Sequence, residues 1–505
     1  MSIPKIAGIE QEYAVASISG RDFNPIQMAY RIVNSFNRFA TILWDYRNET
    51  PFLDARGFSC DREEMRVSRD DNIRINNLLQ NGARFYVDHA HPEFATAECA
   101  NLRELIACDK AGEQILRLSV ERLNRSLPSR ERIQIFKNNS DHKGNSYGCH
   151  ENYLMDAKAY QRLFPQACIF PEYTLKYLLP FLVTRQIYCG AGKIGSENGC
   201  PSVSYQICQR ADFFGTILGA NTTANRPLIN TRDEPHADRK RFRRLHIILG
   251  DANMSEYSEF LKIGTTRLIL KMVEDNVLRR DMALENPVGA NIDISHDISL
   301  KNKVRLADGR QFSPIEIQRV YLEEAQRYCS DGGNCQPEDR EVLQEWEWVL
   351  DRMSEEPRQL NREIDWAIKL WLIERYKARK GLSWQNPRLK RMDIFYHCLS
   401  EGLGLYYALQ SQNRVRRVLD GNSEVEHFIN QPPKNTRAYF RARCLTKFSP
   451  QILEANWDSL SFDVGGAKIK RLLLPDPLKG TSNLVEEIIE QSNTAQELLR
   501  NLKEN

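Results

Sequence analysis

Residues 81–98 bring carboxylates, histidines and an arginine into one short run, and the first half of this run has the pattern of a strand. Side chains alternate along a strand, so Phe85 and Val87 can enter a core while Tyr86 and Asp88 share the opposite face. An aspartate fixed on a strand beside metal-type ligands is typical of a reaction centre. Asp88 is therefore the first candidate catalytic residue.

A second strand, expected over residues 6–13, places two more carboxylates side by side. Glu10 and Glu12 alternate with Ile9 and Gln11, so both acids project from one face. Carboxylate oxygens are the ligands that Mg²⁺ prefers, and crowded carboxylates repel one another when no cation is present. We favour a functional role for Glu10. For Glu12 a solvated acid at a strand end is an equal alternative.

Two histidines and three arginines complete the set of candidate residues. His150 and His246 lie in further expected strands, where a single histidine is more often a hydrogen-bonded core residue than a metal ligand. Guanidinium groups bind phosphate oxygens with two parallel hydrogen bonds, which suits Arg210, Arg232 and Arg244. Salt bridges to neighbouring acids remain the alternative for each arginine. Together these residue types indicate ATP-dependent chemistry at a carboxyl group or at its amide.

Composition excludes several other classes of protein. The 505 residues carry a net charge of +3 and are 41% hydrophobic, so no strong field points to nucleic acid or to a membrane surface. The 12 cysteines form no Cys-x-x-Cys pair, which argues against a structural zinc site. No apolar run is long enough to span a bilayer, and the N-terminus has no signal-type apolar core. We expect a cytoplasmic protein with reduced thiols.

The elements that must position these residues follow from hydrophobic periodicity. Strand patterns dominate the first half and helical patterns the second, which predicts an α+β fold. The pattern breaks at residues 431–433, so we predict a catalytic domain over residues 1–430 and a small C-terminal domain over residues 431–505. The polar segment from Trp44 to Asn76 is expected to be a long, partly mobile loop. Helices are expected over 25–39, 102–123, 255–278 and within 314–377, and strands over 133–137, 147–154 and 243–250.

Six motifs, in order along the chain, resemble those of the Pup ligase and depupylase family, whose relatives include glutamine synthetase and γ-glutamyl-cysteine ligase. The resemblance runs from Gly8 to about the last thirty residues. The motifs are Gly8-Ile-Glu-Gln-Glu-Tyr13, Asn81 through Glu93, Tyr147-Gly-Cys-His-Glu-Asn-Tyr-Leu154, Ile229 through Asp238, Arg243-Arg-Leu-His246 and Gly250-Asp-Ala-Asn253.

The resemblance implies a fold and a set of residue roles. The fold would be a glutamine-synthetase-like antiparallel sheet that cradles the active site, with packed helices and a small C-terminal domain. Position by position, the family's roles transfer to residues of this chain. Glu10, Tyr86 and Glu93 resemble ligands of one Mg²⁺, His150 and His246 ligands of a second, Arg84, Thr96, Arg244 and Trp457 nucleotide contacts, Arg210 and Arg232 a phosphate clamp, and Asp88 the catalytic aspartate.

The family makes or breaks the isopeptide bond between the C-terminal glutamate of Pup, a small protein modifier, and a lysine of a target protein. A depupylase hydrolyses this bond and deamidates a C-terminal glutamine of Pup, using ATP, or ADP plus phosphate, as a cofactor with Mg²⁺. The implied partners are Pup or a Pup-like modifier, pupylated proteins and, functionally, the bacterial proteasome. Neither nucleic acid nor a membrane is expected as a partner.

Two features resemble depupylases rather than ligases. Residues 44–74 resemble an insertion that depupylases carry and ligases lack, and Asp88-His-Ala-His91 has the depupylase form. Residues 95–98, 145–149 and 189–193 are closer to ligases. We therefore expect a depupylase, with a Pup–protein ligase acting through a γ-glutamyl phosphate as the alternative. A non-catalytic Pup-binding scaffold and a small-molecule γ-glutamyl ligase are further alternatives.

Overall fold

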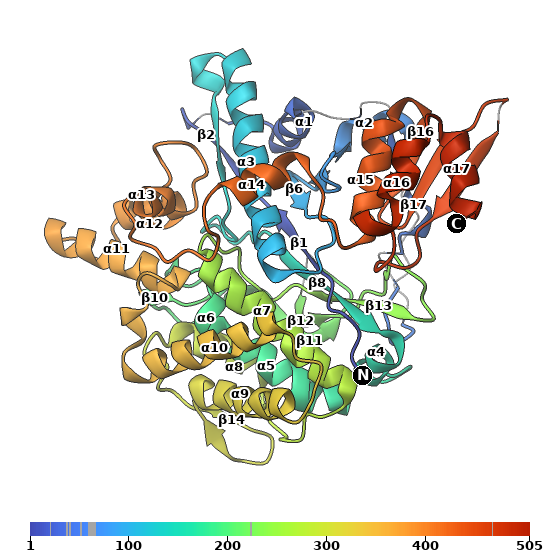
Figure 1. The fold of residues 1–505 in the computed structure, drawn as a ribbon. Coiled ribbons are helices and arrows are strands. Elements are labelled where there is room, and N and C mark those ends of the chain that lie inside the picture. Colours follow the sequence, from blue (N-terminus) through green and yellow to red (C-terminus); the bar gives the residue numbers. More distant parts are fainter. Residues whose placement is uncertain are drawn as a thin grey trace.

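The fold is organised around one six-stranded antiparallel sheet (Figure 1). The computed structural model describes residues 1–20, 22–36, 39, 42–50, 53–58, 67–222, 225–466 and 468–504. The strands lie in the order β13-β8-β1-β6-β5-β4, and every neighbouring pair is antiparallel. Their bounds are β13 Phe242–Ile247, β8 Cys149–Asp156, β1 Ala7–Glu12, β6 His91–Ala95, β5 Arg84–Asp88 and β4 Asn76–Leu78.

Strand β1 shows why one face of this sheet is apolar and the other is acidic. Its residues alternate between buried and partly exposed, with Ala7, Ile9 and Gln11 buried. Ala7 and Ile9 join the main hydrophobic cluster together with residues of α3 (Leu102–Ser126) and α7 (Glu256–Asp275). Both helices therefore cover the apolar face, and Glu10 and Glu12 are left on the open one.

The second half of the chain is helical, as expected, and the α+β class is confirmed. Helices α9 (Pro314–Ser330) and α10 (Pro337–Glu355) pack on each other and on α7, and α11 (Asp365–Lys380) follows them. Trp346 and Trp366 are fully buried core residues, whereas Trp348 and Trp371 pack against the clusters in partly buried positions. The other helices are α1 Pro25–Ser35, α4 Ala157–Leu163, α5 Leu179–Thr184, α6 Gln186–Cys189, α8 Pro287–His296, α12 Pro387–Tyr396, α13 Leu405–Ser411 and α14 Ser423–Asn430.

Small two-stranded sheets surround the main one. Strands β2 and β7 pair antiparallel behind α1, and β11 and β12 pair in parallel beside β13. Their bounds, with those of the remaining short strands, are β2 Ala14–Ser17, β7 Ile133–Phe136, β9 Lys193–Ile194, β10 Tyr205–Gln206, β11 Phe214–Gly219, β12 Arg226–Asn230, β14 Val304–Arg305 and β15 Gln311–Phe312.

The C-terminal residues pack around a hydrophobic cluster of their own, at the red end of the chain in Figure 1. This cluster joins side chains of a four-stranded sheet, in the order β18-β17-β16-β3, to side chains of three helices. Strand β3, Leu43–Trp44, comes from the other end of the chain and pairs in parallel with β16. The division at residue 430 remains a prediction. The C-terminal elements are α15 Arg437–Lys447, β16 Ile452–Asn456, β17 Ser459–Asp463, β18 Ile469–Leu473, α16 Ser482–Gln491 and α17 Ala495–Glu504.

The expectation of a long loop over Trp44–Asn76 is wrong at both ends of that segment. Trp44 is 2% exposed in the C-terminal core, and a 3-10 helix follows at Tyr46–Asn48. Helix α2, Arg69–Ile75, begins after Ser68, whose hydroxyl accepts a hydrogen bond from the backbone of Asp71. Residues 51–52 and 59–66 lie outside the described residues. The ends of the segment are therefore structural, because they complete a sheet and cap a helix.

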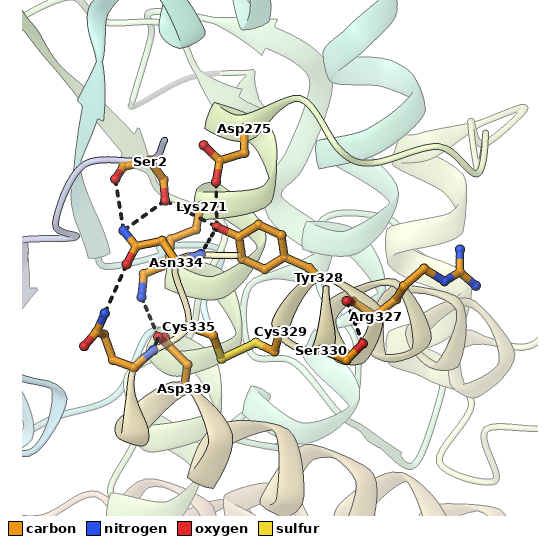
Figure 2. The surroundings of a disulfide bond; sticks show 11 residues. Ser2, Lys271, Asp275, Arg327, Tyr328, Cys329, Ser330, Asn334, Cys335 and Asp339 are labelled. Carbon is orange, nitrogen blue, oxygen red and sulfur yellow. Dashed lines mark hydrogen bonds and ion pairs between the residues drawn. A yellow bond between two sulfur atoms is a disulfide. The ribbon is translucent and has the colours of Figure 1, made fainter. Parts of the chain in front are cut away.

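The expectation of reduced thiols is wrong for one pair of cysteines. Cys329 and Cys335 form a disulfide that closes the turn between α9 and α10 (Figure 2). Within this turn Tyr328 donates a hydrogen bond to Asp275, and the Asn334 amide donates to the carbonyl of Ser2. The turn thereby holds the N-terminal residues. Nine other cysteines in the described part are free, and none of its helices is long and apolar enough to cross a membrane.

A buried ion cluster joins the main sheet to the C-terminal elements. Glu98 accepts hydrogen bonds from Arg437 Nε at 2.8 Å and from Arg441 Nη2 at 2.6 Å, both on α15. Arg441 also donates to the carbonyls of Gly82 and Trp457. Burial alone would raise the pKa of Glu98, but Arg441 and Arg437 outweigh it and lower the pKa to about 2.

We expect Glu98→Gln to lower the free energy of unfolding near pH 7 by about 3 kcal/mol, because two buried guanidinium groups lose their carboxylate. The pKa of Glu98 is depressed in the folded state, so this stabilisation is present above its ordinary value of 4.5 and is lost as the pH falls toward about 2. Urea unfolding near pH 7 and pH 4, followed by tryptophan fluorescence, measures both effects.

Glu323→Gln is the matched control, because Glu323 forms an exposed ion pair with Arg280 and its loss should change stability by less than about 0.5 kcal/mol. Equal effects of the two substitutions near pH 7 would contradict the role of Glu98.

Candidate active site

The predicted acids and histidines, together with Tyr86, form a row across the open face of the main sheet. Cross-strand partners share a face, so the register decides which side chains meet. Glu10 lies opposite His150, and Glu12 lies opposite Glu93. Tyr86 in turn lies opposite Glu93, on its other side. Across the strands β13-β8-β1-β6-β5, the side chains of the row therefore begin with the two histidines and end with Asp88.

The first candidate metal centre contains Glu10, His150 and His246, each offering one ligand atom within 4.8 Å of the others. His150 Nδ1 is 3.3 Å from Glu10 Oε2, and His246 Nδ1 is 2.8 Å from Asn152 Oδ1. The Nε2 atom of His246 is buried and has no hydrogen-bond partner among the described residues. Burial, and then the charge of Arg244, lower the pKa of His246 well below its usual value. A neutral imidazole with one free ring nitrogen fits a metal ligand.

The second candidate centre contains Glu12, Asp88 and Glu93, again within 4.8 Å. Glu93 is 2% exposed, and burial together with Asp88, Glu12 and Glu10 raises its pKa well above its usual value. Carboxylates packed this closely share protons unless a cation neutralises them. This donor set of oxygens fits Mg²⁺.

The structure groups the predicted metal ligands differently from the grouping that the resemblance implies. The sequence predicts Glu10, Tyr86 and Glu93 at one ion and the two histidines at another, whereas in the structure Glu10 joins the histidines and Glu93 joins Glu12. Tyr86 lies beside Glu93, and burial, then Glu93 and Glu10, raise the pKa of its phenol well above 10.0. The ligand roles themselves remain predictions.

A pocket beside the first centre gathers most of the predicted nucleotide contacts. Thr96, Arg244 and Trp457 all line it, together with Glu10. Gly8 also lines this pocket, beside Thr96. His236, which the sequence analysis did not single out, also lines the pocket, and its Nδ1 is buried without a hydrogen-bond partner among the described residues.

Arg84 does not line this pocket. Its guanidinium carbon lies 3.9 Å from the ring centre of Trp44 and 4.1 Å from that of Tyr86. Its Nη2 and Nε donate to Asn76 Oδ1 at 2.6 and 2.9 Å. Arg84 thus connects β5 to β3 by a cation–π contact with Trp44 and to β4 by its hydrogen bonds with Asn76.

Asp88 opens into a separate cavity of about 560 Å³, lined also by Glu12, His150, Arg210 and Tyr147. Asp88 Oδ1 is 3.0 Å from His89 Nδ1, and the Asp88 side chain is 42% exposed, so a substrate can reach it. Glu10 and Glu12, two residues apart on one face of β1, thus face different spaces: Glu10 the pocket and Glu12 the cavity.

Arg210 and Arg232, predicted as a phosphate clamp, are in different places. Arg210 is 1% exposed in the wall of the cavity. Arg232 follows β12 and lines neither space; its backbone forms a bridge with Asp54, and its Nη1 lies 3.8 Å from Glu234 Oε2. Thr231 Oγ1 donates to Asp54 Oδ2 at 2.6 Å, so residues 53–58 support the chain at Arg232.

Further cavity residues were missed by the sequence analysis. His91 Nδ1 lies 3.2 Å from Glu12 Oε2 and its ring packs on Tyr147. Ser146 lies in Gly144-Asn-Ser-Tyr-Gly148, which has the spacing of a nucleophile elbow. The run precedes strand β8 instead of joining a strand to a helix, and Ser146 Oγ accepts from Arg210 Nε. The spacing could have identified Ser146 in the sequence, although as a nucleophile and not as a hydrogen-bond acceptor for Arg210.

Known proteins resemble the chain over nearly its whole length. A family model described as Pup-ligase protein matches residues 5–461. A depupylase of Acidothermus cellulolyticus is 42% identical over 98% of this chain and 98% of its own. A Pup–protein ligase of Pseudarthrobacter chlorophenolicus is 40% identical over 82% of this chain and 90% of its own.

Two solved structures of a Pup ligase, PafA, have a similar fold. PafA in complex with the prokaryotic ubiquitin-like protein Pup has a TM-score of 0.79 at 30% identity, covering 98% of this chain and 97% of that one. PafA in complex with ADP has a TM-score of 0.73 at 33% identity, covering 86% and 96%.

We expect Mg²⁺ binding to release protons and to become tighter as the pH rises. The pKa of Glu93 is raised in the metal-free protein, and a cation that prefers the ionised carboxylate must displace its proton. Isothermal titration near pH 6, in buffers of different ionisation enthalpy, counts the protons released. Glu93→Gln should bind Mg²⁺ at least about 10-fold more weakly and release fewer protons.

Glu285→Gln serves as the control, since Glu285 is 56% exposed in a surface ion pair. Proton release that is unchanged in Glu93→Gln would show that another group titrates.

Proposed function

Because the chain belongs to the Pup ligase and depupylase family, we propose that it is a nucleotide-dependent depupylase and Pup deamidase. The observation that carries the choice of branch is the sequence comparison: the depupylase is 42% identical over 98% of the chain, and the ligase is 40% identical over 82%. The bond to be hydrolysed joins the γ-carboxyl group of the C-terminal glutamate of Pup, or of a Pup-like modifier, to a lysine of a target protein. Such an activity serves the bacterial proteasome pathway.

Asp88 supplies the chemistry at the isopeptide carbonyl in this proposal. Its carboxylate, on the rigid strand β5 and open to the cavity, attacks the carbonyl carbon or removes a proton from an attacking water molecule. In the first route the lysine nitrogen takes up a proton from solvent and leaves as the amine, and water then hydrolyses the acyl–Asp88 anhydride to free the γ-carboxylate and restore Asp88. In the second route the proton that Asp88 takes from water passes to the lysine nitrogen as the C–N bond breaks. For a C-terminal glutamine the same attack releases ammonia, so one aspartate serves both hydrolysis and deamidation.

The residues present also fit a nucleotide and Mg²⁺. Glu10, His150 and His246 would hold one ion, and Glu12 and Glu93 a second, with Tyr86 beside them. Bound Mg²⁺ and nucleotide would supply positive charge and phosphate oxygens next to the reacting carbonyl. Thr96, Arg244 and Trp457 would contact the nucleotide, and Arg84 would act indirectly, by holding Trp44 against Trp457.

The second candidate is a Pup–protein ligase that phosphorylates the same glutamate. It is favoured by the 40% identity to a ligase and by the TM-score of 0.79 to PafA. Asp88 would then remove a proton from the attacking lysine. The two activities differ in their use of ATP, because a ligase consumes one ATP for each bond formed.

We expect the purified protein with ATP and Mg²⁺ to release Pup from a pupylated protein without stoichiometric formation of ADP. Asp88→Asn should slow this release on the order of 10³-fold or more while nucleotide binding persists, because Asp88 lies in the cavity and outside the nucleotide pocket. Gel analysis of the conjugate and a coupled ADP assay measure the two quantities, and Asp351→Asn, at an exposed ion pair, is the control.

A parallel reaction with free Pup and the target protein separates the alternatives. New conjugate that forms in step with ADP would identify a ligase. Turnover of ATP with free glutamate and an amine would identify a small-molecule ligase. Absence of every reaction, with Pup still bound, would identify a scaffold.

A further inference from the structure

Two arginines lie together in the wall of the cavity that contains Asp88. Arg210 and Arg226 both line it, and both contact Ser146: Arg210 Nε donates to Ser146 Oγ at 3.2 Å, and Arg226 Nη2 donates to the Ser146 carbonyl at 3.2 Å. Their other contacts are also with neutral oxygens. Arg226 Nε donates to the Thr222 carbonyl at 2.9 Å, and Arg210 Nη1 to the carbonyls of Ile248 and Gly250.

This pair of cations lacks a counter-ion of its own. Neither guanidinium forms an ion pair with a described carboxylate, and the cavity carboxylate that attracts both is Glu12, which already faces His91, Asp88 and Glu93. Burial, and then the neighbouring charge of Arg210, lower the pKa of Arg226 to about 10. Like charges side by side in a partly buried position are stabilised when an anion binds between them.

The substrate of the proposed reaction supplies such an anion. A chain-terminal glutamate linked through its γ-carboxyl group keeps a free α-carboxylate, and two methylene groups separate its α-carbon from the carbonyl that is attacked. A cavity of about 560 Å³ is large enough for both ends of this residue, and Asp88 and the two arginines are among its lining side chains. An internal glutamate or glutamine has a neutral peptide group in place of the α-carboxylate.

Resting on the proposed function, we propose that Arg226, beside Arg210, binds the free α-carboxylate of the modifier's last residue and so restricts the enzyme to chain-terminal glutamyl and glutaminyl groups. Arg226 is therefore a specificity-determining residue. The fork of a guanidinium group can form two parallel hydrogen bonds to a carboxylate, which fixes the reacting carbonyl against Asp88. A phosphate of the nucleotide is the other source of an anion, but Arg226 does not line the nucleotide pocket.

The test compares two forms of a modifier ending in glutamine, one with a free α-carboxylate and one with an α-carboxamide. Ammonia release gives kcat/KM for each. The wild-type protein should prefer the carboxylate on the order of 10²-fold, because the amide leaves a cation unpaired. Arg226→Gln should lose most of this preference by slowing only the carboxylate form. Arg226→Lys, which keeps the charge without the fork, should retain part of it.

Lys143→Gln is the matched control, because Lys143 is an exposed cation in the same loop as Ser146 and does not line the cavity. It should keep the wild-type preference. An unchanged preference in Arg226→Gln, with an unchanged thermal midpoint, would overturn the inference. Equal slowing of both substrates with weaker ADP binding would also overturn it and would assign Arg226 to a phosphate.

The inference and the proposed function fail in different ways. If the wild-type protein hydrolyses both forms at the same rate, the proposed function is supported and the specificity role of Arg226 is refuted. If it hydrolyses neither, the proposed function is refuted, and the inference that rests on it is refuted as well.

Discussion

Repulsion among carboxylates on one face of the main sheet is the constraint on which the rest of the site depends. Glu10, Glu12, Glu93 and Asp88 project from three neighbouring strands on one face of the sheet, where Glu93 is buried and Asp88 stays partly exposed. The protein places the imidazoles of His150 and His91 against two of these acids, and burial together with the neighbouring acids raises the pKa of Glu93. These contacts relieve part of the repulsion, and a bound cation would relieve the rest.

Alternate side chains in the six residues of strand β1 either pack behind the sheet or face the candidate site in front of it. Ala7 and Ile9 fix the strand to the helices behind the sheet, so the acids in front cannot move apart to relieve their repulsion. Rigidity behind the sheet therefore preserves an unfavourable arrangement in front of it. The open face is divided again, with Glu10 in a pocket shared with Trp457 and Glu12 in a cavity shared with Asp88. A reaction at a peptide bond that depends on a bound nucleotide would need two such separate spaces.

Local pattern predicts a large part of the fold and of the candidate residues. The strands that carry Glu10 and Asp88 and the long helices after residue 100 follow from periodicity, because each is longer than one repeat of its pattern. The grouping of ligands does not follow, since Glu10 meets His150 through the register of two strands that lie 140 residues apart.

Strand β3 was missed because it has two residues and its partner strand begins at Ile452. The place of Arg84, between the rings of Trp44 and Tyr86, depends on that same pairing. The disulfide between Cys329 and Cys335 was also not predicted, because the expectation of reduced thiols came from composition alone. Arg226 carries no local signal, because only the folded chain places it beside Arg210.

Leu43–Trp44 pair in parallel with Glu454–Ala455, so segments from near the two ends of the chain meet in one sheet. A ribosome releases Trp44 long before it makes Ala455, so the early strand must wait, with its hydrogen-bonding groups unmatched, until almost the whole polypeptide has emerged. Trp457, which lines the pocket beside Glu10, is made at the same late moment. A chain that ends before Ile452 would therefore carry Asp88 but lack both the partner strand of β3 and this wall of the pocket.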